Sequence, residues 1–218
     1  MQTQLLGCNA VAAVVVTLSL VVGSGCGKSA GSISRITDSS KIVVEPGRGV
    51  PKVCELGMTF REIKRATGEA TTHGLYDRSW SLKRLTQERY LLVPTLGVIG
   101  IPGEKGGWEL LTFHVQPYDS SISSPGLVVN SPFRGSVANR LSFNNRSVSR
   151  KEVEAAFGTV TQGSTNSSQS LKHIDKTQPF FIRSENVETF YYTQLGLRFR
   201  LESDVVTSFG VWKPTKFE

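Results

Sequence analysis

The side chains best suited to covalent or metal chemistry in this 218-residue chain are its few cysteines and histidines. Cys54 is the only cysteine after Cys26, and one thiol cannot close an internal disulfide. A Cys54 thiolate beside a histidine would form a nucleophile–base pair, whereas the other interpretation is a cysteine packed as a small hydrophobic residue. The histidines have no Cys, His or carboxylate at ligand spacing, which predicts no metal site and no cofactor; they are His73, His114 and His173.

A phosphate-binding loop is a second chemistry to consider, because residues 25–29 read Gly-Cys-Gly-Lys-Ser. The P-loop motif requires a glycine five positions before Gly27, where this chain has Val22. The motif must also open a helix, and residues 30–34 are a poor helix start. We therefore predict no nucleotide binding. Acidic residues never form a compact pair in a glycine-rich or aromatic frame, so the sequence does not support glycosidase chemistry. Since no catalytic site stands out, we predict that the chain is not an enzyme.

The N-terminal segment carries the clearest signal of location. Residues 5–22 are uncharged and mostly apolar, and they end in Gly-Ser-Gly before Cys26. This pattern predicts a signal peptide over residues 1–25. The small residues before Cys26 resemble the lipobox of bacterial lipoproteins, and the resemblance implies that Cys26 is acylated (palmitate or a similar chain) and becomes the N-terminus. An uncleaved membrane anchor and simple secretion are the alternatives.

The next segment and the charge indicate how the folded part meets its surroundings. Residues 26–41, the lipidated Cys followed by a Gly-, Ser- and Thr-rich stretch, are predicted to form a flexible tether. The folded part then lies in the cell envelope, facing the periplasm or the exterior. The net charge of +7 is spread without a Lys/Arg block, which favours acidic partners and argues against nucleic acid.

Two short segments each specify a capped helix. Thr59 and Ser149 are N-caps, and Glu62 and Glu152, three residues later, complete capping boxes. A glycine ends each segment, over residues 58–68 and 148–158. The two segments align without a gap, which predicts an internal repeat.

Strands are expected after each helix. Apolar and polar residues alternate over 195–202, as in a sheet with one face on a core and one in water. We therefore predict an α+β fold of two tandem repeats, each a short capped helix followed by a three-stranded antiparallel meander. The predicted boundaries are repeat 1 over 42–117, a linker over 118–126 and repeat 2 over 127–218. In this scheme His114 lies on the water-facing side of its strand.

At the level of motif, residues 56–68 and 148–158 resemble the unit of the BamE (SmpA/OmlA) family of small bacterial lipoproteins. Two such units in tandem resemble the architecture of β-lactamase inhibitor protein. The resemblance implies non-catalytic work, either stabilising an outer-membrane assembly or occluding the active site of an enzyme. The helix-to-strand loops, 69–88 and 159–179, are longer than in single-unit members.

A surface for a partner is the remaining candidate site. Basic residues gather on the first helix and in the loop after it, and others alternate along a late strand beside a tyrosine. Such charges either solubilise the protein or dock an acidic partner. The candidate partner-binding residues are Arg61, Lys64, Arg65, Arg84, Tyr191, Arg198 and Arg200.

Together these patterns predict a non-catalytic, membrane-tethered lipoprotein of the cell envelope that binds or scaffolds a protein partner. One alternative is an inhibitor-type module that occludes an enzyme, with aromatic or acidic anchors on a concave sheet face. The other is an envelope hydrolase that uses Cys54 and a histidine.

Overall fold

A computed structural model describes residues 38–74, 89–102, 107–119, 128–165 and 174–214. The chain divides into two compact units, Met1–Ser32 and Ile33–Glu218, and all of the described residues belong to the second. The predicted signal peptide, Cys26 and most of the tether lie outside the described residues.

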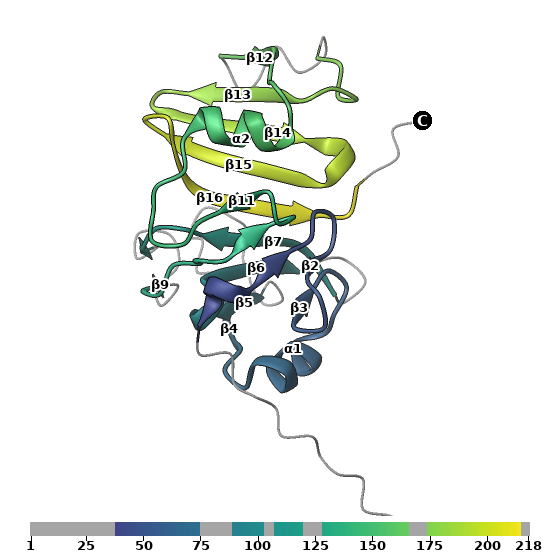
Figure 1. Cartoon of the computed structure of the whole chain (residues 1–218). Helices are drawn as coiled ribbons and strands as arrows, with labels where there is room; N and C mark the ends of the chain where they lie inside the picture. Colours follow the sequence, from purple (N-terminus) through teal and green to yellow (C-terminus); the bar gives the residue numbers. More distant parts are fainter. Residues whose placement is uncertain (1–37, 75–88, 103–106, 120–127, 166–173, 215–218) are drawn as a thin grey trace, which may run out of the picture. The chain divides into compact units, whose positions relative to one another are not determined.

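A nine-stranded sheet dominates the fold (Figure 1). All neighbours are antiparallel except β12 and β13, which are parallel. In order across the sheet the strands are β12 (Gln162–Ser164), β13 (Phe180–Ser184), β14 (Val187–Tyr192), β15 (Leu197–Glu202), β16 (Val205–Trp212), β7 (Trp108–His114), β6 (Val98–Pro102), β5 (Arg89–Val93) and β4 (Thr71–Gly74).

Three small sheets accompany the large one. A three-stranded sheet joins segments far apart in sequence, because β1 runs parallel to β10. The small strands are β1 (Val43–Val44), β10 (Ser136–Val137) and β11 (Leu141–Ser142), then β2 (Gly49–Val50) with β3 (Cys54–Glu55), and β8 (Tyr118–Asp119) with β9 (Val128–Val129). Single-turn 3-10 helices lie at Ser39–Lys41, Pro94–Leu96 and Thr193–Leu195.

Both predicted helices form, and both are capped as the sequence indicates. Helix α1 spans Phe60–Thr67 and α2 spans Arg150–Phe157. The backbone N–H of Thr59 donates to Glu62 Oε2 over 2.7 Å, and that of Ser149 donates to Glu152 Oε2 over 2.9 Å. Figure 1 shows α2 against β14 and β15, on the face of the sheet that also carries the β1–β10–β11 sheet.

The predicted fold class, α+β with two tandem helix-plus-three-strand repeats, is wrong. The structure is predominantly β, and its main sheet runs through both halves because β7 pairs with β16. The segments expected to be helix-to-strand loops contribute β4 and β12, and the segments before the helices form strands of the small sheets. Short polar strands such as Thr71–Gly74 lack the alternation that marks a strand in sequence.

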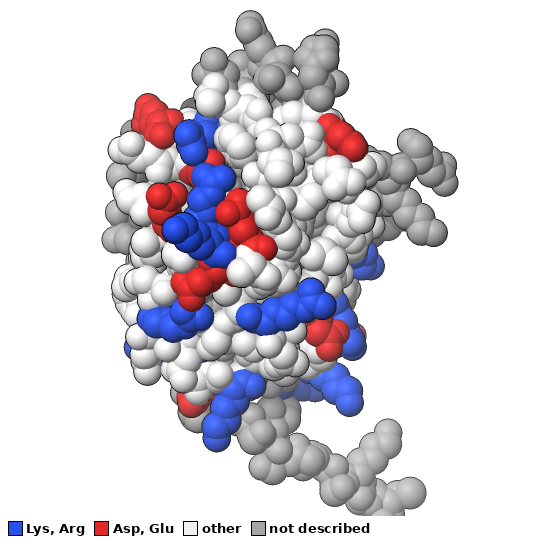
Figure 2. All heavy atoms as spheres, turned by 45° about the horizontal axis from the view of Figure 1, so that its top comes forward, with Lys and Arg blue, Asp and Glu red and all other residues white. Residues whose placement is uncertain are grey.

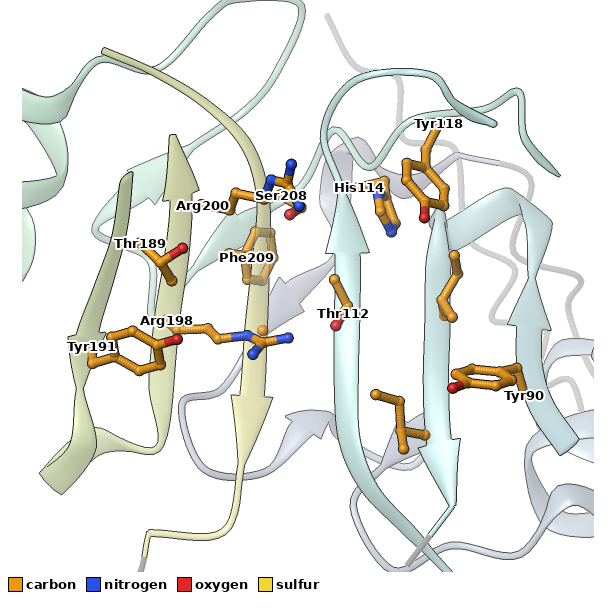
Figure 3. A pocket seen from close by; sticks show the side chains of 13 residues that line it. Tyr90, Thr112, His114, Tyr118, Thr189, Tyr191, Arg198, Arg200, Ser208 and Phe209 are labelled. Carbon is orange, nitrogen blue, oxygen red and sulfur yellow. The ribbon is translucent and has the colours of Figure 1, made fainter. Parts of the chain in front are cut away.

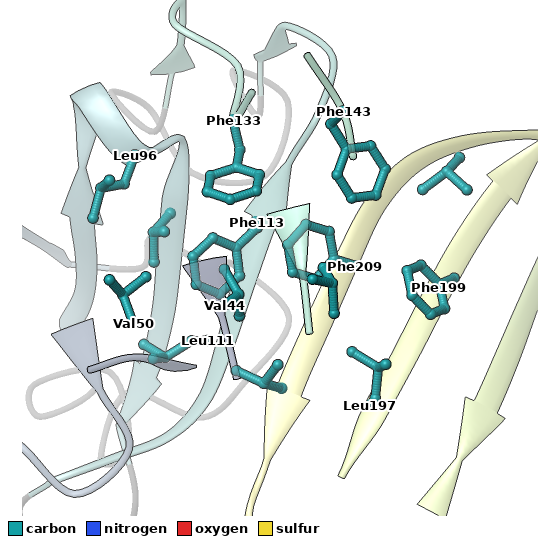
Figure 4. Close-up of a cluster of buried hydrophobic side chains, with 14 of the residues drawn as sticks. Val44, Val50, Leu96, Leu111, Phe113, Phe133, Phe143, Leu197, Phe199 and Phe209 are labelled. Carbon is teal, nitrogen blue, oxygen red and sulfur yellow. The ribbon is translucent and has the colours of Figure 1, made fainter. Parts of the chain in front are cut away.

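One aromatic core lies on the helix-bearing face of the large sheet (Figure 4). Phe113 and Phe209 face each other across the β7–β16 pair, and their rings stack with centroids 4.8 Å apart. Phe133 packs edge-on against both, and Phe143 stacks on Phe209 at 5.3 Å. These contacts fix the β7–β16 junction, and with it the opposite face of the sheet.

Candidate binding groove on the outer sheet face

The face of the large sheet opposite the core, here called the outer face, carries a groove of about 270 Å³. Because side chains alternate between the faces of a strand, residues next to core positions on β7, β15 and β16 reach the outer face. Those that line the groove are Thr112, His114, Arg198, Arg200, Ser208 and Gly210. The groove crosses the middle of the sheet from β5 to β14 (Figure 3). Its basic and aromatic lining comprises Tyr90, His114, Tyr118, Tyr191, Arg198, Arg200 and Phe209.

Arg198 crosses the floor of this groove. The β14–β15 register places Arg198 directly opposite Tyr191, so the two residues share the outer face. Figure 3 shows the Arg198 side chain reaching from β15 across β16. It passes over Gly210, where an added Cβ would lie 2.8 Å from Arg198 Nε. The absence of a side chain at Gly210 therefore lets the guanidinium lie flat in the groove.

The two groove arginines differ in their partners. Arg200 Nη2 lies 3.1 Å from Glu202 Oε1 on the same strand, an ion pair that is about half exposed. Arg198, in contrast, has no ion pair and no side-chain hydrogen bond among the residues described by the structure. The groove thus holds one compensated and one uncompensated guanidinium.

His114 lies on the outer face, as predicted, but it is covered rather than open to water. Only 8% of the residue is exposed, because Tyr118 of β8 stacks on the imidazole with ring centroids 4.2 Å apart. Burial, and then the charge of Arg200, lower the pKa of His114 to about 4. The imidazole is therefore neutral at pH 7. It has no side-chain hydrogen bond within the described ranges.

Aromatic and aliphatic side chains close the two ends of the groove. At one end Tyr191 stacks on Phe180 at 4.9 Å and meets Trp212 edge-on at 6.4 Å. At the other end Tyr90 packs against a small cluster of Leu92, Ile99 and Val129. Rigid aromatic walls of this kind supply contact area at a low cost in side-chain entropy.

The predicted partner-binding residues separate into two groups. Tyr191, Arg198 and Arg200 come together in the groove. Arg61, Lys64 and Arg65 lie exposed on α1 and do not line it, and Arg84 lies outside the described residues. Lys64 Nζ is 5.6 Å from the centroid of the Phe60 ring, a local contact within α1.

Four other residues of the groove were not among the predicted partner-binding residues: Tyr90, His114, Tyr118 and Gly210. Tyr118 lies at the start of the segment predicted to be a linker, and Gly210 matters only through the path of Arg198. Tyr90 and His114 sit on strands whose outward positions were recognisable. Their place beside Arg198 and Arg200 depends on the β7–β16 pairing, which no local pattern signals.

Several charged residues around α2 form ion pairs. On α2 and the neighbouring strands, Glu188 receives Arg150 at 3.1 Å and Arg183 at 2.9 Å, while its side chain is only 7% exposed. Figure 2 shows basic and acidic side chains interleaved on one face. The arginines paired with Glu188 are therefore compensated, unlike Arg198 in the groove.

Cys54 lies within the core cluster, away from the groove. The residue is fully buried, and burial raises the pKa of its thiol to about 12. His73 is in β4 but its side chain is not described, and His173 lies outside the described residues. The structure therefore brings Cys54 together with packing partners and not with His114, which lines the opposite face of the sheet.

Three further observations concern metal sites, membrane-spanning helices and similarity to known proteins. Over the described ranges, no three His, Cys, Asp or Glu side chains gather as they would around a metal ion. Those ranges also contain no helix of sufficient length and apolar character to cross a bilayer. Comparisons with protein-family models, curated proteins and solved structures found no match to this chain.

Proposed function

We propose that this protein is a non-catalytic lipoprotein of the cell envelope that holds a protein partner in the groove of its outer sheet face. The observation that carries the proposal is the groove itself, in which Arg198 lies between tyrosines and has no ion pair with any residue that the structure describes. Arginine and tyrosine are the residue types over-represented where protein–protein binding energy concentrates.

The attachment to the envelope rests on the sequence. The apolar segment before Cys26 and the Gly/Ser-rich stretch after it support an acylated N-terminus with a flexible tether. A tethered protein samples partners at the membrane at a raised effective concentration, so a modest groove can suffice for binding. The resemblance of residues 56–68 and 148–158 to BamE-type units, at the level of motif, also supports a non-catalytic role.

Site-specific photo-cross-linking in intact cells tests this proposal. A photoreactive residue is placed at Thr189, which lines the groove, and at the exposed Arg140 on the β10–β11 turn as the matched control. We expect a discrete protein adduct from position 189 only, and loss or depletion of that adduct in a Cys26→Ala variant. Mass spectrometry of the Cys26 peptide reports the acyl chains.

Two results would contradict the proposal. Equal adducts from positions 189 and 140 would show that the groove is not the contact surface. A Cys26 peptide without acyl mass, together with no adduct at position 189, would remove both the tether and the partner. If the captured protein is an enzyme, its activity with and without this chain identifies the inhibitor-type form of the same role.

A further inference from the structure

The charge of Arg198, which has no ion pair among the described residues, favours a ligand with a negative charge in the groove. Removing a guanidinium from water without a counter-charge costs free energy, and an acidic ligand recovers it. Arg200 is already paired with Glu202, and His114 is neutral at pH 7, so the floor offers a single uncompensated positive charge. A carboxylate carries one negative charge and accepts two parallel N–H bonds from a guanidinium.

A second polar group on the same surface also lacks a partner. His114 is 8% exposed, and its imidazole makes no hydrogen bond to the described parts of the chain. Figure 3 shows the ring on β7 under Tyr118, facing the groove. Among the described residues, the buried side-chain nitrogen without a partner is Trp108 Nε1 and not a ring nitrogen of His114. The His114 nitrogens are therefore accessible from the groove, where a ligand can form a hydrogen bond with them.

The size of the groove indicates the form of the ligand. Its volume of about 270 Å³ is just below the range of about 300–1,000 Å³ that is usual for small-molecule sites. The groove crosses from β5 to β14, and tyrosines stand at both ends. These dimensions suit a few side chains of a chain segment laid across the sheet.

We propose that the groove binds an acidic segment of a partner protein, with one Asp or Glu carboxylate paired to Arg198, a hydrogen bond to His114, and flanking residues against Tyr191 and Tyr90. This assignment rests on the proposed function and names the chemistry of its partner. Gly210 is the positioning residue, because it leaves room for Arg198 to lie across β16.

The test uses the purified full-length chain in detergent on an array of mixed hexapeptides. One position is fixed, and matched sets carry Glu, Gln or phosphoserine there. We expect retention of the Glu set over the Gln set by about tenfold to a hundredfold, the effect of one charge-assisted hydrogen-bonded pair. Arg198→Gln should abolish this preference, whereas Arg140→Gln, the same charge change on an exposed site, should preserve it.

Gly210→Ala separates geometry from charge. The variant retains Arg198 but displaces its side chain, since the new Cβ would lie 2.8 Å from Nε. The clash is with the flexible end of a side chain, so the fold should survive, which circular dichroism checks. We expect a weakened preference for Glu at unchanged net charge. An unchanged preference would show that Arg198 does not bind from its position across Gly210.

Other outcomes would overturn the assignment of an acidic segment. The cross-linking result then shows whether the proposed function also fails. Equal retention of the Glu and Gln sets, or stronger retention of the phosphoserine set, would exclude a carboxylate site. Binding to phosphatidylglycerol vesicles that is lost in Arg198→Gln would assign the groove to a membrane surface. If the cross-linked partner is captured equally by Arg198→Gln, the carboxylate contact fails while partner binding survives; if no partner is captured at all, the proposed function fails first.

Discussion

The surroundings of His114 tie the stability of the fold to pH. The pKa of His114 falls from 6.5 in a free side chain to about 4 in the protein. Below pH 6.5 the unfolded chain therefore binds a proton at this residue while the native state stays unprotonated. Native stability is therefore complete above pH 6.5 and declines as the pH falls towards 4. Between pH 6.5 and about pH 5 the expected loss is on the order of 2 kcal/mol, measured by urea unfolding.

The matched variant for this effect is His114→Gln, which retains a polar side chain but cannot titrate. We expect its unfolding free energy to change less over the same pH interval than that of the parent. The interval avoids carboxylates such as Glu152, whose pKa is lowered to about 2 and whose contribution is lost below about pH 4.5. Identical pH profiles for the two proteins would show that His114 is not held neutral.

At Cys54 the structure predicts an inert thiol. The residue is fully buried and its pKa is raised to about 12, so thiolate is scarce at pH 8 in the native state. We expect iodoacetamide to leave the Cys54 peptide unmodified in native protein and to modify it fully in denaturant, as read by peptide mass spectrometry. Rapid labelling of the native protein would instead favour the nucleophile interpretation.

Among the elements, the two short helices depend on their caps. Each is only eight residues long, too short to be stable by itself, so its N-terminal hydrogen bonds matter. Thr59→Ala and Ser149→Ala should each lower the unfolding free energy by about 1 kcal/mol. Thr161→Ala is the control, since this exposed threonine is near α2 and makes no side-chain hydrogen bond with the described residues. Equal stability of the three variants would show that the caps contribute nothing.

The elements also show what the sequence can and cannot specify. Capping boxes are local signals, so the positions of α1 and α2 could be predicted from Thr59, Glu62, Ser149 and Glu152. Alternation located β15 for the same reason. The edge strands could not be predicted, because Thr71–Gly74 and Gln162–Ser164 owe their extended form to pairing with β5 and β13. Such pairing is a tertiary contact that local propensity does not report.

For the molecule as a whole, the decisive contact is the pair β7–β16. It turns two strand groups into one sheet, and it brings Arg198 and Arg200 to the same groove as His114 and Thr112. The register Tyr191↔Arg198 was within reach of sequence reasoning, because β14 and β15 are neighbours in the chain. The pairing of β7 with β16, which come from opposite halves of the chain, could not be predicted in this way. Half of the groove depends on that pairing.

A substitution in the core beneath the β7–β16 pair should therefore lower the stability of both halves of the sheet. Phe209 is 1% exposed and stacks on Phe113 and Phe143, so Phe209→Leu should cost on the order of 2 kcal/mol. In native-state hydrogen exchange we expect amides of β5 and β14 to lose protection by the same amount. Ile101→Val, at the exposed rim, should change either strand by less than about 0.5 kcal/mol. Loss of protection in β14 alone would mean that the halves unfold separately.

The first described strand has a consequence for the order in which this chain completes its fold. Val44 of β1 is fully buried and pairs with Val137, and the N–H of Arg134 donates to the hydroxyl of Ser39, 95 residues earlier. A ribosome delivers the N-terminal side of these contacts long before the C-terminal side, and the same holds for β7 and its later partner β16. The strands of the first half thus lack β16, their neighbour in the sheet, until Val205–Trp212 has been synthesised. An open polypeptide of this kind is the form that can be threaded across a membrane before it folds.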